Sequence, residues 1–275
     1  MIEDNVAVET TSYRCDHPVG GSRVSKIMPK IVKGGIKRLL YRLGFGLCRQ
    51  DDLPGSVRMK MIQHHGIQTV IDVGGNVGGY GAEVREYGYS GRIISFEPTA
   101  QAYERLAARA KTDPKWIVSK TAIGEFNGEV KINVAANEAK SSSLLPMLGL
   151  HAEYAPDACY VSSEQVPLNT LNTVLGGILL PEEKVLLKID TQGYEHMVLK
   201  GASDILRQVE LVECELSLVA LYDGQLLFDQ MIALLRNLGF EPVRFTPGFT
   251  DPQSGHNLQI DAIFSRSERS NRMQS

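Results

Sequence analysis

Three groups of polar residues in this sequence follow short apolar runs, and their residue types could contact a ligand. The first group lies in residues 70–78, which read Val-Ile-Asp-Val-Gly-Gly-Asn-Val-Gly. Glycines allow a tight turn and a close approach of the backbone to a ligand. The loop has neither the G-x-G-x-x-G spacing of a dinucleotide site nor the Gly-Lys-Ser/Thr end of a P-loop. A ligand with positive charge and hydroxyl groups suits it better, and a tight turn without a ligand is the alternative. The candidate binding residues are Asp72, Gly74, Asn76 and Gly78.

The second group is Glu97 and Pro98, which follow the apolar run 92–96. A carboxylate about 20 residues beyond a glycine loop is placed to accept two hydrogen bonds from a ribose diol. Pro98 ends the strand and begins the following helix. A surface acid is the alternative for Glu97, but its offset from the glycine loop favours ribose binding.

The third group follows the run 185–189 and contains Asp190, Gly193 and Glu195. We expect this strand beside the first one, so that Asp190 faces the same crevice and is a candidate for both cofactor binding and catalysis. Glu195 lies near a helix N-terminus, where a favourable interaction with the helix dipole is the alternative role. On the next strand Glu215 could reach the crevice, and an exposed edge or a salt bridge is equally compatible with its position.

The elements that must position these residues alternate along the chain. Apolar, β-branched runs predict strands, and stretches with helical periodicity lie between them. This alternation predicts an α/β fold with a mainly parallel sheet and right-handed crossovers, in which ligands bind beyond the carboxyl ends of the strands. Residues 129–163 are polar after a first strand and are expected to form an excursion from the core. We expect strands at 69–73, 92–96, 116–119, 130–134, 185–190, 209–216, 242–245 and 258–264, and helices at 57–66, 76–87, 99–111, from about 194, and at 228–238.

Composition excludes several classes of protein. The 275 residues are 43% hydrophobic and 22% charged, as in an ordinary globular protein. A net charge of −3 argues against a globally basic nucleic-acid binder. No apolar run is long enough to span a membrane. The four cysteines are scattered without a C-x-x-C pair, so we expect reduced thiols and a cytoplasmic protein. Neither an H-E-x-x-H motif nor a close carboxylate cluster indicates a metal site.

The chain divides into four predicted segments. Residues 1–22 are expected to be a flexible N-terminus, residues 23–56 a basic amphipathic helical extension, residues 57–266 the catalytic domain, and residues 267–275 a flexible tail. Residues 23–50 contain no acid and carry eight basic residues. Their apolar stripe can dock on the main domain, or the basic helix can contact an anionic membrane surface or an acidic partner. Contact with a membrane surface would place the protein peripherally at the inner face of the membrane.

Together, these motifs resemble the FkbM family of S-adenosylmethionine-dependent methyltransferases. The resemblance covers roughly residues 57–266, with Gly75 where alanine is usual and Thr191-Gln192 in place of a common Val-Glu. The segments that carry it are 70–78, 96–98, 141–144 and 188–195, and 198–202 and 259–264 are similar too.

The resemblance implies a class I methyltransferase fold, a Rossmann-like sheet of seven strands with the last antiparallel and helices on both faces. It implies S-adenosyl-L-methionine as cofactor, with the glycine loop at its methionine part and Glu97 at its ribose. Ala122 and Ile123 would line the adenine. Members of the family generally methylate hydroxyl groups of sugars or natural products.

The chemistry of such a reaction asks little of the protein beyond alignment and proton removal. The sulfonium is a strong methyl donor, so the protein mainly aligns the acceptor oxygen with the S–CH₃ bond. A carboxylate or histidine then removes the hydroxyl proton. Asp190 is the first candidate for this base or for orienting the acceptor, and Glu195 is the second. His256, in the loop before the last strand, is the third candidate, although a lone loop histidine is usually just solvated.

We therefore predict an O-methyltransferase acting on a hydroxyl of a sugar, a glycolipid or a related natural product. Polyketide, peptide and lipid acceptors stay open as alternatives, and a glycolipid would suit the basic extension. A nicotinamide-dependent oxidoreductase is disfavoured by the missing G-x-G-x-x-G spacing, and a non-catalytic interaction protein by the acids at positions 72, 97 and 190. Nucleic acid is not an expected partner, and the sequence does not indicate an oligomeric state.

Overall fold

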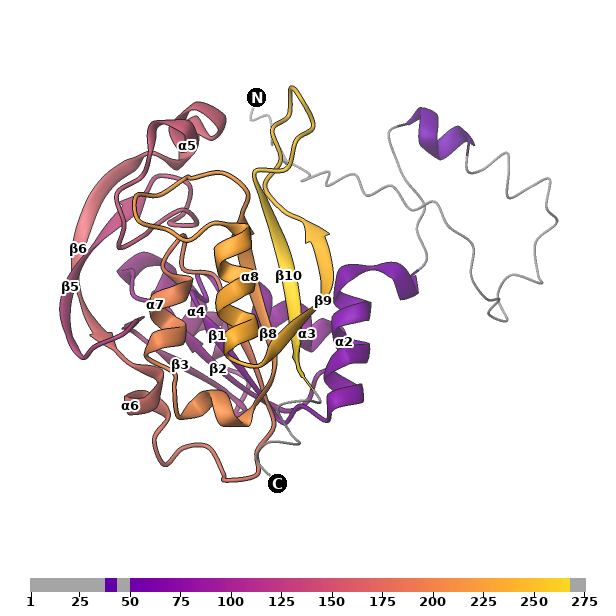
Figure 1. Ribbon diagram of the computed structural model, residues 1–275, viewed down its shortest axis with the longest axis vertical. Helices are drawn as coiled ribbons and strands as arrows, with labels where there is room; N and C mark the ends of the chain where they lie inside the picture. Colours follow the sequence, from indigo (N-terminus) through magenta and orange to yellow (C-terminus); the bar gives the residue numbers. More distant parts are fainter. Residues whose placement is uncertain (1–37, 44–49, 268–275) are drawn as a thin grey trace. The chain divides into compact units, whose positions relative to one another are not determined.

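A computed structural model describes residues 38–43 and 50–267 of the chain (Figure 1). Contacts divide the chain into two units, Met1–Val57 and Arg58–Ser275, and each is described by itself. In the first unit, residues 38–42 are helical, and a 3-10 helix covers Gln50–Asp52. Helix α2 (Pro54–His65) begins there and continues into the second unit. Three predicted segments lie wholly or mostly outside the described residues: the flexible segment 1–22, the basic helix and the tail.

The second unit is built on a sheet that has seven strands in the described part of the chain, in the order β3-β2-β1-β7-β8-β10-β9 (Figure 1). Strands β3 to β8 of this order run parallel, and β10 is antiparallel to both β8 and β9. This arrangement confirms the expected class I methyltransferase sheet. The strands are β1 (Thr69–Val73), β2 (Arg92–Phe96), β3 (Trp116–Ser119), β7 (Val185–Ile189), β8 (Val209–Ser217), β9 (Phe240–Pro247) and β10 (Gln259–Arg266).

Helices cover both faces of this sheet, as predicted. On one face Val70 of β1 belongs to a buried cluster with residues of α2, α3 (Gly79–Glu86) and α4 (Ala100–Ala110). On the other face Ile71 belongs to a cluster with residues of α6 (Leu171–Leu175), α7 (Glu195–Lys200) and α8 (Phe228–Asn237). All five residues of β1 are buried, which explains why this strand is a continuous run in the sequence rather than an alternating one.

The predicted excursion forms a second sheet beside the first one. Strands β4 (Ala122–Ile123), β5 (Gly128–Ala135) and β6 (Tyr160–Asn169) pair in the order β4-β6-β5, and β5 and β6 make the long curved ribbon of Figure 1. The chain between β5 and β6 holds α5 (Gly149–Tyr154) and a 3-10 helix at Pro156–Ala158. Sequence analysis missed β6 and this sheet, because most residues of β6 are polar or solvent-accessible on both faces.

A glycine lies where the end of α7 meets the second sheet. Gly201 follows α7, and a Cβ atom added there would lie 1.9 Å from the carbonyl oxygen of Gly124, just after β4. Only glycine permits this approach. The glycine in segment 198–202, which is part of the resemblance, therefore has a structural reason. A further 3-10 helix, at Ile205–Gln208, leads into β8.

Candidate active site

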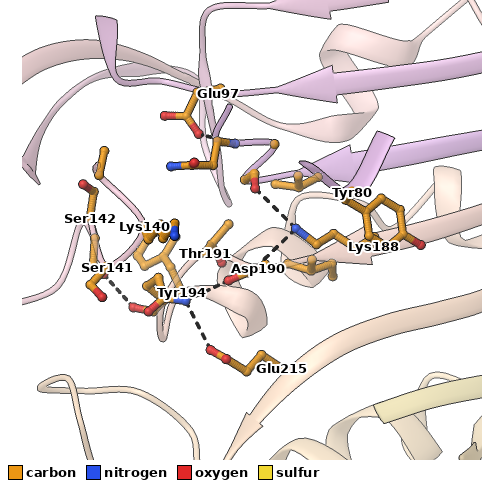
Figure 2. A pocket seen from close by; sticks show the side chains of 18 of the residues that line it. Tyr80, Glu97, Lys140, Ser141, Ser142, Lys188, Asp190, Thr191, Tyr194 and Glu215 are labelled. Carbon is orange, nitrogen blue, oxygen red and sulfur yellow. Dashed lines mark hydrogen bonds and ion pairs between the residues drawn. The ribbon is translucent and has the colours of Figure 1, made fainter. Parts of the chain in front are cut away.

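A cavity of about 660 Å³ opens at the carboxyl ends of the parallel strands. This size is within the range of small-molecule sites. The tips of β1, β2, β7, β8 and β10 supply residues to it, and residues 137–144 of the excursion face them. Figure 2 shows Ser141 and Ser142 on one side, with Glu97 and Glu215 toward opposite ends. Of the predicted cofactor residues, the cavity is lined by Gly74, Asn76, Glu97, Pro98, Ala122, Ile123 and Asp190.

The glycine loop is held by the two neighbouring strand tips. Gly74 has a φ of 80°, and a Cβ atom there would lie 1.9 Å from the carbonyl oxygen of Asp190. The backbone N–H groups of Gly74 and Gly75 donate to the carbonyl oxygen of Phe96 at 3.0 and 2.9 Å. Helix α3 begins at Gly79 rather than at the predicted residue 76, because Asn76 and Gly78 have φ angles of 43° and 81°.

Glu97 is the buried carboxylate at the tip of β2. Its Oε1 accepts hydrogen bonds from the N–H and the hydroxyl of Thr99, and its Oε2 accepts the N–H of Asn76 at 2.9 Å. Burial raises the pKa of Glu97, and these hydrogen bonds partly oppose the increase. Each carboxylate oxygen can accept about two hydrogen bonds, so Oε2 retains one position for a ribose hydroxyl. With apolar Ala122 and Ile123 beside it, this end of the cavity fits a nucleoside.

Four polar side chains lie side by side at the same level of the sheet, and we call them the polar row: Ser95, Asp72, Lys188 and Glu213, on β2, β1, β7 and β8. Lys188 and Glu213 also line the cavity. Asp72 is fully buried and does not line the cavity. Its Oδ2 accepts the Ser95 hydroxyl at 2.9 Å, and its Oδ1 forms an ion pair with Lys188 Nζ at 3.3 Å. The predicted binding residue Asp72 thus contacts side chains of the two neighbouring strands rather than the cavity. The predicted binding residue Gly78 does not line the cavity either.

Lys188 connects the polar row to the cavity. Its Nζ is 3.4 Å from Asp190 Oδ2 and 5.4 Å from the centre of the Tyr80 ring, and Figure 2 shows it between these two residues. Burial alone would lower the pKa of Lys188, but the carboxylates of Asp190 and Asp72 outweigh burial and raise it above its usual value. Lys188 is therefore a permanent cation beneath the site.

The other end of the polar row is closed by α2. The Arg58 Nη2 donates to Glu213 Oε1 at 2.7 Å and its Nη1 to Glu83 at 2.8 Å. The Tyr80 hydroxyl donates to Glu213 Oε2 at 2.7 Å. For Glu215, the sequence left open access to the crevice, an exposed edge or a salt bridge, and in the structure Glu215 lines the cavity, as Glu213 does.

The three predicted bases have different surroundings. Asp190 lines the cavity and accepts a hydrogen bond from Gln192 Nε2 at 2.8 Å. Glu195 is buried, and its Oε1 accepts the N–H groups of Thr191 and Gly193, so it stabilises the turn before α7. His256 is exposed in the loop before β10. Neither Glu195 nor His256 lines the cavity, and the catalytic roles of all three remain predictions.

Several cavity residues escaped the sequence analysis because they come from distant parts of the chain. Asp261 and Gln259 on β10, Phe249 in the loop before it, and the buried His151 of α5 all line the cavity. The serine run of the resemblance was the one signal for the excursion side. There the Ser143 hydroxyl donates to the carbonyl oxygen of Gln192 at 2.7 Å, which ties the excursion to the tip of β7.

Within the described residues, no group of three or more histidine, cysteine or acidic side chains is arranged to hold a metal ion. No helix among the same residues is long and apolar enough to cross a membrane.

The family of the chain follows from a comparison with protein-family models. The Methyltransferase FkbM domain matches residues 72–242, which is more than half of the chain. The chain therefore belongs to the FkbM methyltransferase family, and its methyl donor is S-adenosyl-L-methionine. No curated protein matched the sequence.

Among solved structures, the chain is similar to other methyltransferases at low identity. The 1,6-didemethyltoxoflavin-N1-methyltransferase of Burkholderia thailandensis is 12% identical, with a TM-score of 0.42, over 92% of this chain and 94% of that one. The magnesium protoporphyrin IX methyltransferase of Synechocystis PCC 6803 is 9% identical, with a TM-score of 0.40, over 86% and 97%. An rRNA methylase of Streptococcus thermophilus is 10% identical, with a TM-score of 0.43, over 80% and 100%.

Proposed function

We propose that this protein is an O-methyltransferase that transfers the methyl group of S-adenosyl-L-methionine to a hydroxyl of a sugar, a glycolipid or a related natural product. One observation carries the proposal: a single cavity joins a nucleoside-sized end at β1 and β2 to an end rich in hydrogen-bond acceptors at β7, β8 and β10. The second end has the chemistry to receive an acceptor with several hydroxyl groups.

At the cofactor end, Glu97 would accept a ribose hydroxyl, the glycine loop would face the methionine part, and Ala122 with Ile123 would line the adenine. When bound, the cofactor supplies an electrophilic methyl group on a cationic sulfur. The protein contributes alignment, because bringing the acceptor oxygen into line removes most of the entropic barrier. Asp190 is placed to orient the acceptor hydroxyl, since Lys188 and Gln192 fix its carboxylate.

The acceptor end supports a polyhydroxylated molecule through its side chains. Carboxylates and amides of Asp190, Gln192, Glu215, Gln259 and Asp261 face the cavity, and they provide acceptors and donors for several hydroxyls. The aromatic side chains of Phe249 and Tyr194 also line the cavity. An acceptor that is purely apolar would leave these polar groups desolvated and unpaired, which is costly.

A glycolipid acceptor would also explain the basic residues of segment 23–50, because an anionic membrane surface attracts such segments. We propose peripheral membrane contact through this segment. This segment lies mostly outside the described residues, and a variant that begins at Leu53 tests the proposed contact.

The proposed function is tested in two stages. Calorimetry with S-adenosylhomocysteine should show binding, whereas NAD should neither bind nor raise the melting temperature. Radiolabelled S-adenosyl-L-methionine should then transfer label to members of a panel of p-nitrophenyl glycosides, with the O-methyl group located by NMR. Transfer of label to polyketide or peptide alcohols but to no glycoside would contradict the proposal that the acceptor is a sugar. The proposal that the protein is a methyltransferase would still hold.

A further inference from the structure

The acceptor end of the cavity holds a pair of carboxyl groups to which no separate role has been given. Glu215 on β8 and Asp261 on β10 are directly opposite in the antiparallel register, and both line the cavity. Cβ atoms at such positions are about 4.5–5.5 Å apart, and like charges there repel one another. Two ionised carboxylates are therefore unfavourable, and the pair favours a state in which one of them keeps its proton.

The two carboxyl groups differ in their hydrogen bonds. Glu215 Oε2 accepts the side-chain amides of Gln259 at 2.5 Å and Gln192 at 3.2 Å. By contrast, Asp261 is exposed to the cavity, and no hydrogen bond to its carboxylate is formed by any residue in the described part of the chain. Its acceptor positions are open to a molecule in the cavity, whereas those of Asp190 are partly taken by Lys188 and Gln192.

The sheet order places Asp261 on the acceptor side. The residues that fit the nucleoside are at the tips of β2 and β1, Asp190 follows at β7, and Glu215 and Asp261 come next at β8 and β10. Neighbouring strands are about 4.8 Å apart, so β10 is four spacings, or about 19 Å, from β2. The β8 and β10 side of the cavity therefore lies away from the nucleoside end, where a hydroxylated acceptor has room beside the tip of β7.

Resting on the proposed function, we propose that Asp261 takes the proton of the hydroxyl that is methylated, while Glu215 keeps its own proton beside it and Asp190 orients the hydroxyl. In this step the acceptor oxygen bonds to the methyl carbon as the carbon–sulfur bond breaks. The sulfur keeps the bonding electron pair and becomes a neutral thioether. The hydroxyl proton passes to a carboxylate oxygen of Asp261, so charge and atoms balance.

The surroundings of the pair set the pH at which Asp261 is ready to accept a proton. Desolvation by the protein, with the charges of Asp190 and Glu213, raises the pKa of Asp261 to about 7. Burial and neighbouring carboxylates raise the pKa of Glu215 well above its usual range. A base with a pKa near the working pH is the most effective one. The charged and titratable groups around the pair are Arg58, Lys188, Asp190, Glu195, Glu213, Cys214 and Tyr222.

The first test observes the proton directly and needs no acceptor. Infrared spectra of protein labelled with carbon-13 at aspartate side-chain carboxyls should show a protonated-aspartate band that fades with rising pH, with a midpoint near 7. Asp261→Asn should remove the band, and Asp190→Asn should retain it. Glu215→Gln should retain it too, because it keeps a neutral group beside Asp261. Thermal unfolding checks that each variant folds, and Asp261→Glu, which keeps a carboxyl group, serves if Asp261→Asn does not fold.

The second test uses the p-nitrophenyl glycoside that accepts label. For the wild type, kcat/KM should rise with pH to a plateau above about 7. Asp261→Asn should lower the plateau about 100-fold or more and abolish this limb, with the dissociation constant of S-adenosylhomocysteine unchanged within about threefold. Glu129→Gln, on the exposed face of β5, is the matched control and should behave as the wild type.

The outcomes separate the two claims. Absence of S-adenosylhomocysteine binding or of label transfer to any glycoside would contradict the proposed function, whatever the infrared band does. Binding and transfer without a titrating Asp261 band, or with an unchanged pH limb in Asp261→Asn, would overturn the assignment of Asp261 alone. A limb lost only in Asp190→Asn would make Asp190 the proton acceptor instead.

Discussion

Glu97 combines two tasks in one carboxylate. It holds the glycine loop through the Asn76 N–H and the following helix through Thr99, and we propose that its remaining acceptor position binds the ribose. We expect Glu97→Gln to preserve the fold, because the amide oxygen can still accept, and to weaken S-adenosylhomocysteine binding about 10- to 100-fold through loss of a charge-assisted hydrogen bond. Calorimetry measures this change. Unaltered affinity in a folded variant would contradict the ribose role, and Glu129→Gln is the control.

Lys188 offers a test of the buried charges. Lys188→Met leaves the fully buried Asp72 without its cation, and breaking a buried ion pair in this way costs about 3–5 kcal/mol. Urea denaturation should show this loss in the free energy of unfolding, and the double variant with Asp72→Asn should recover part of it. Lys184→Met, an exposed position just before β7, should change stability by less than about 0.5 kcal/mol.

Single residues also show how far the sequence predicts the site. Glu97 and Asp190 directly follow β2 and β7, and Asn76 lies in the loop after β1, so strand direction alone brings all three to one edge. Asp72 lies inside β1, and the strand register places it beside Lys188, within the sheet rather than in the cavity. Asp261 could not be predicted, since its place beside Glu215 depends on the antiparallel insertion of β10 between β8 and β9.

At the level of elements, the pairing of β8 with β10 has a consequence for stability. The pKa of Asp261 is raised from 3.8 to about 7, so the folded state binds more protons than the unfolded state between these values. Stability therefore falls as pH rises through this window. Asp261→Asn removes the charge that forms at high pH.

The melting temperature of Asp261→Asn should therefore equal that of the wild type below about pH 3.5, exceed it increasingly as pH rises through the window, and exceed it by about 3 °C near pH 8. The shift of about 3 °C assumes that the charge of Asp261 lowers the free energy of unfolding by about 1 kcal/mol, because solvent screens the exposed side chain. Differential scanning calorimetry across this range decides the matter. A difference that is constant with pH would exclude a raised pKa as its cause.

The elements differ in how well the sequence predicts them. Strands β1, β2 and β3 have the predicted bounds. The runs of β1 and β2 are almost wholly buried and leave little ambiguity, whereas in β3 only Trp116 is buried. Strand β6 pairs antiparallel with β5 at the periphery, where exposed polar residues give no periodic signal. Helix α2 begins at Pro54, three residues before the predicted start, since proline is well accommodated in a first helical turn.

For the whole molecule, the open question is the basic segment that precedes the catalytic domain. A variant beginning at Leu53 retains all of α2, including Arg58 and its contact with Glu213. We expect it to bind S-adenosylhomocysteine with wild-type affinity and to lose co-sedimentation with vesicles that contain about 30% anionic lipid, because basic residues drive such binding. Equal sedimentation of both chains would refute the membrane contact, and neutral vesicles are the control.

The polar row has a further consequence for how this sheet tolerates change. Asp72, Lys188 and Glu213, with Arg58 of α2 beyond them, alternate in sign, so each of these charges pairs with a residue on another element, and Lys188 also pairs with Asp190 just after its own strand. A slip of one residue in any of the three strands would turn its charge toward the opposite layer, which is built mainly of apolar side chains. We therefore expect the polar row to disfavour incorrect strand register during folding. Sequence drift at these positions should be tolerated only as coordinated exchanges, whereas the neighbouring apolar positions can vary one at a time.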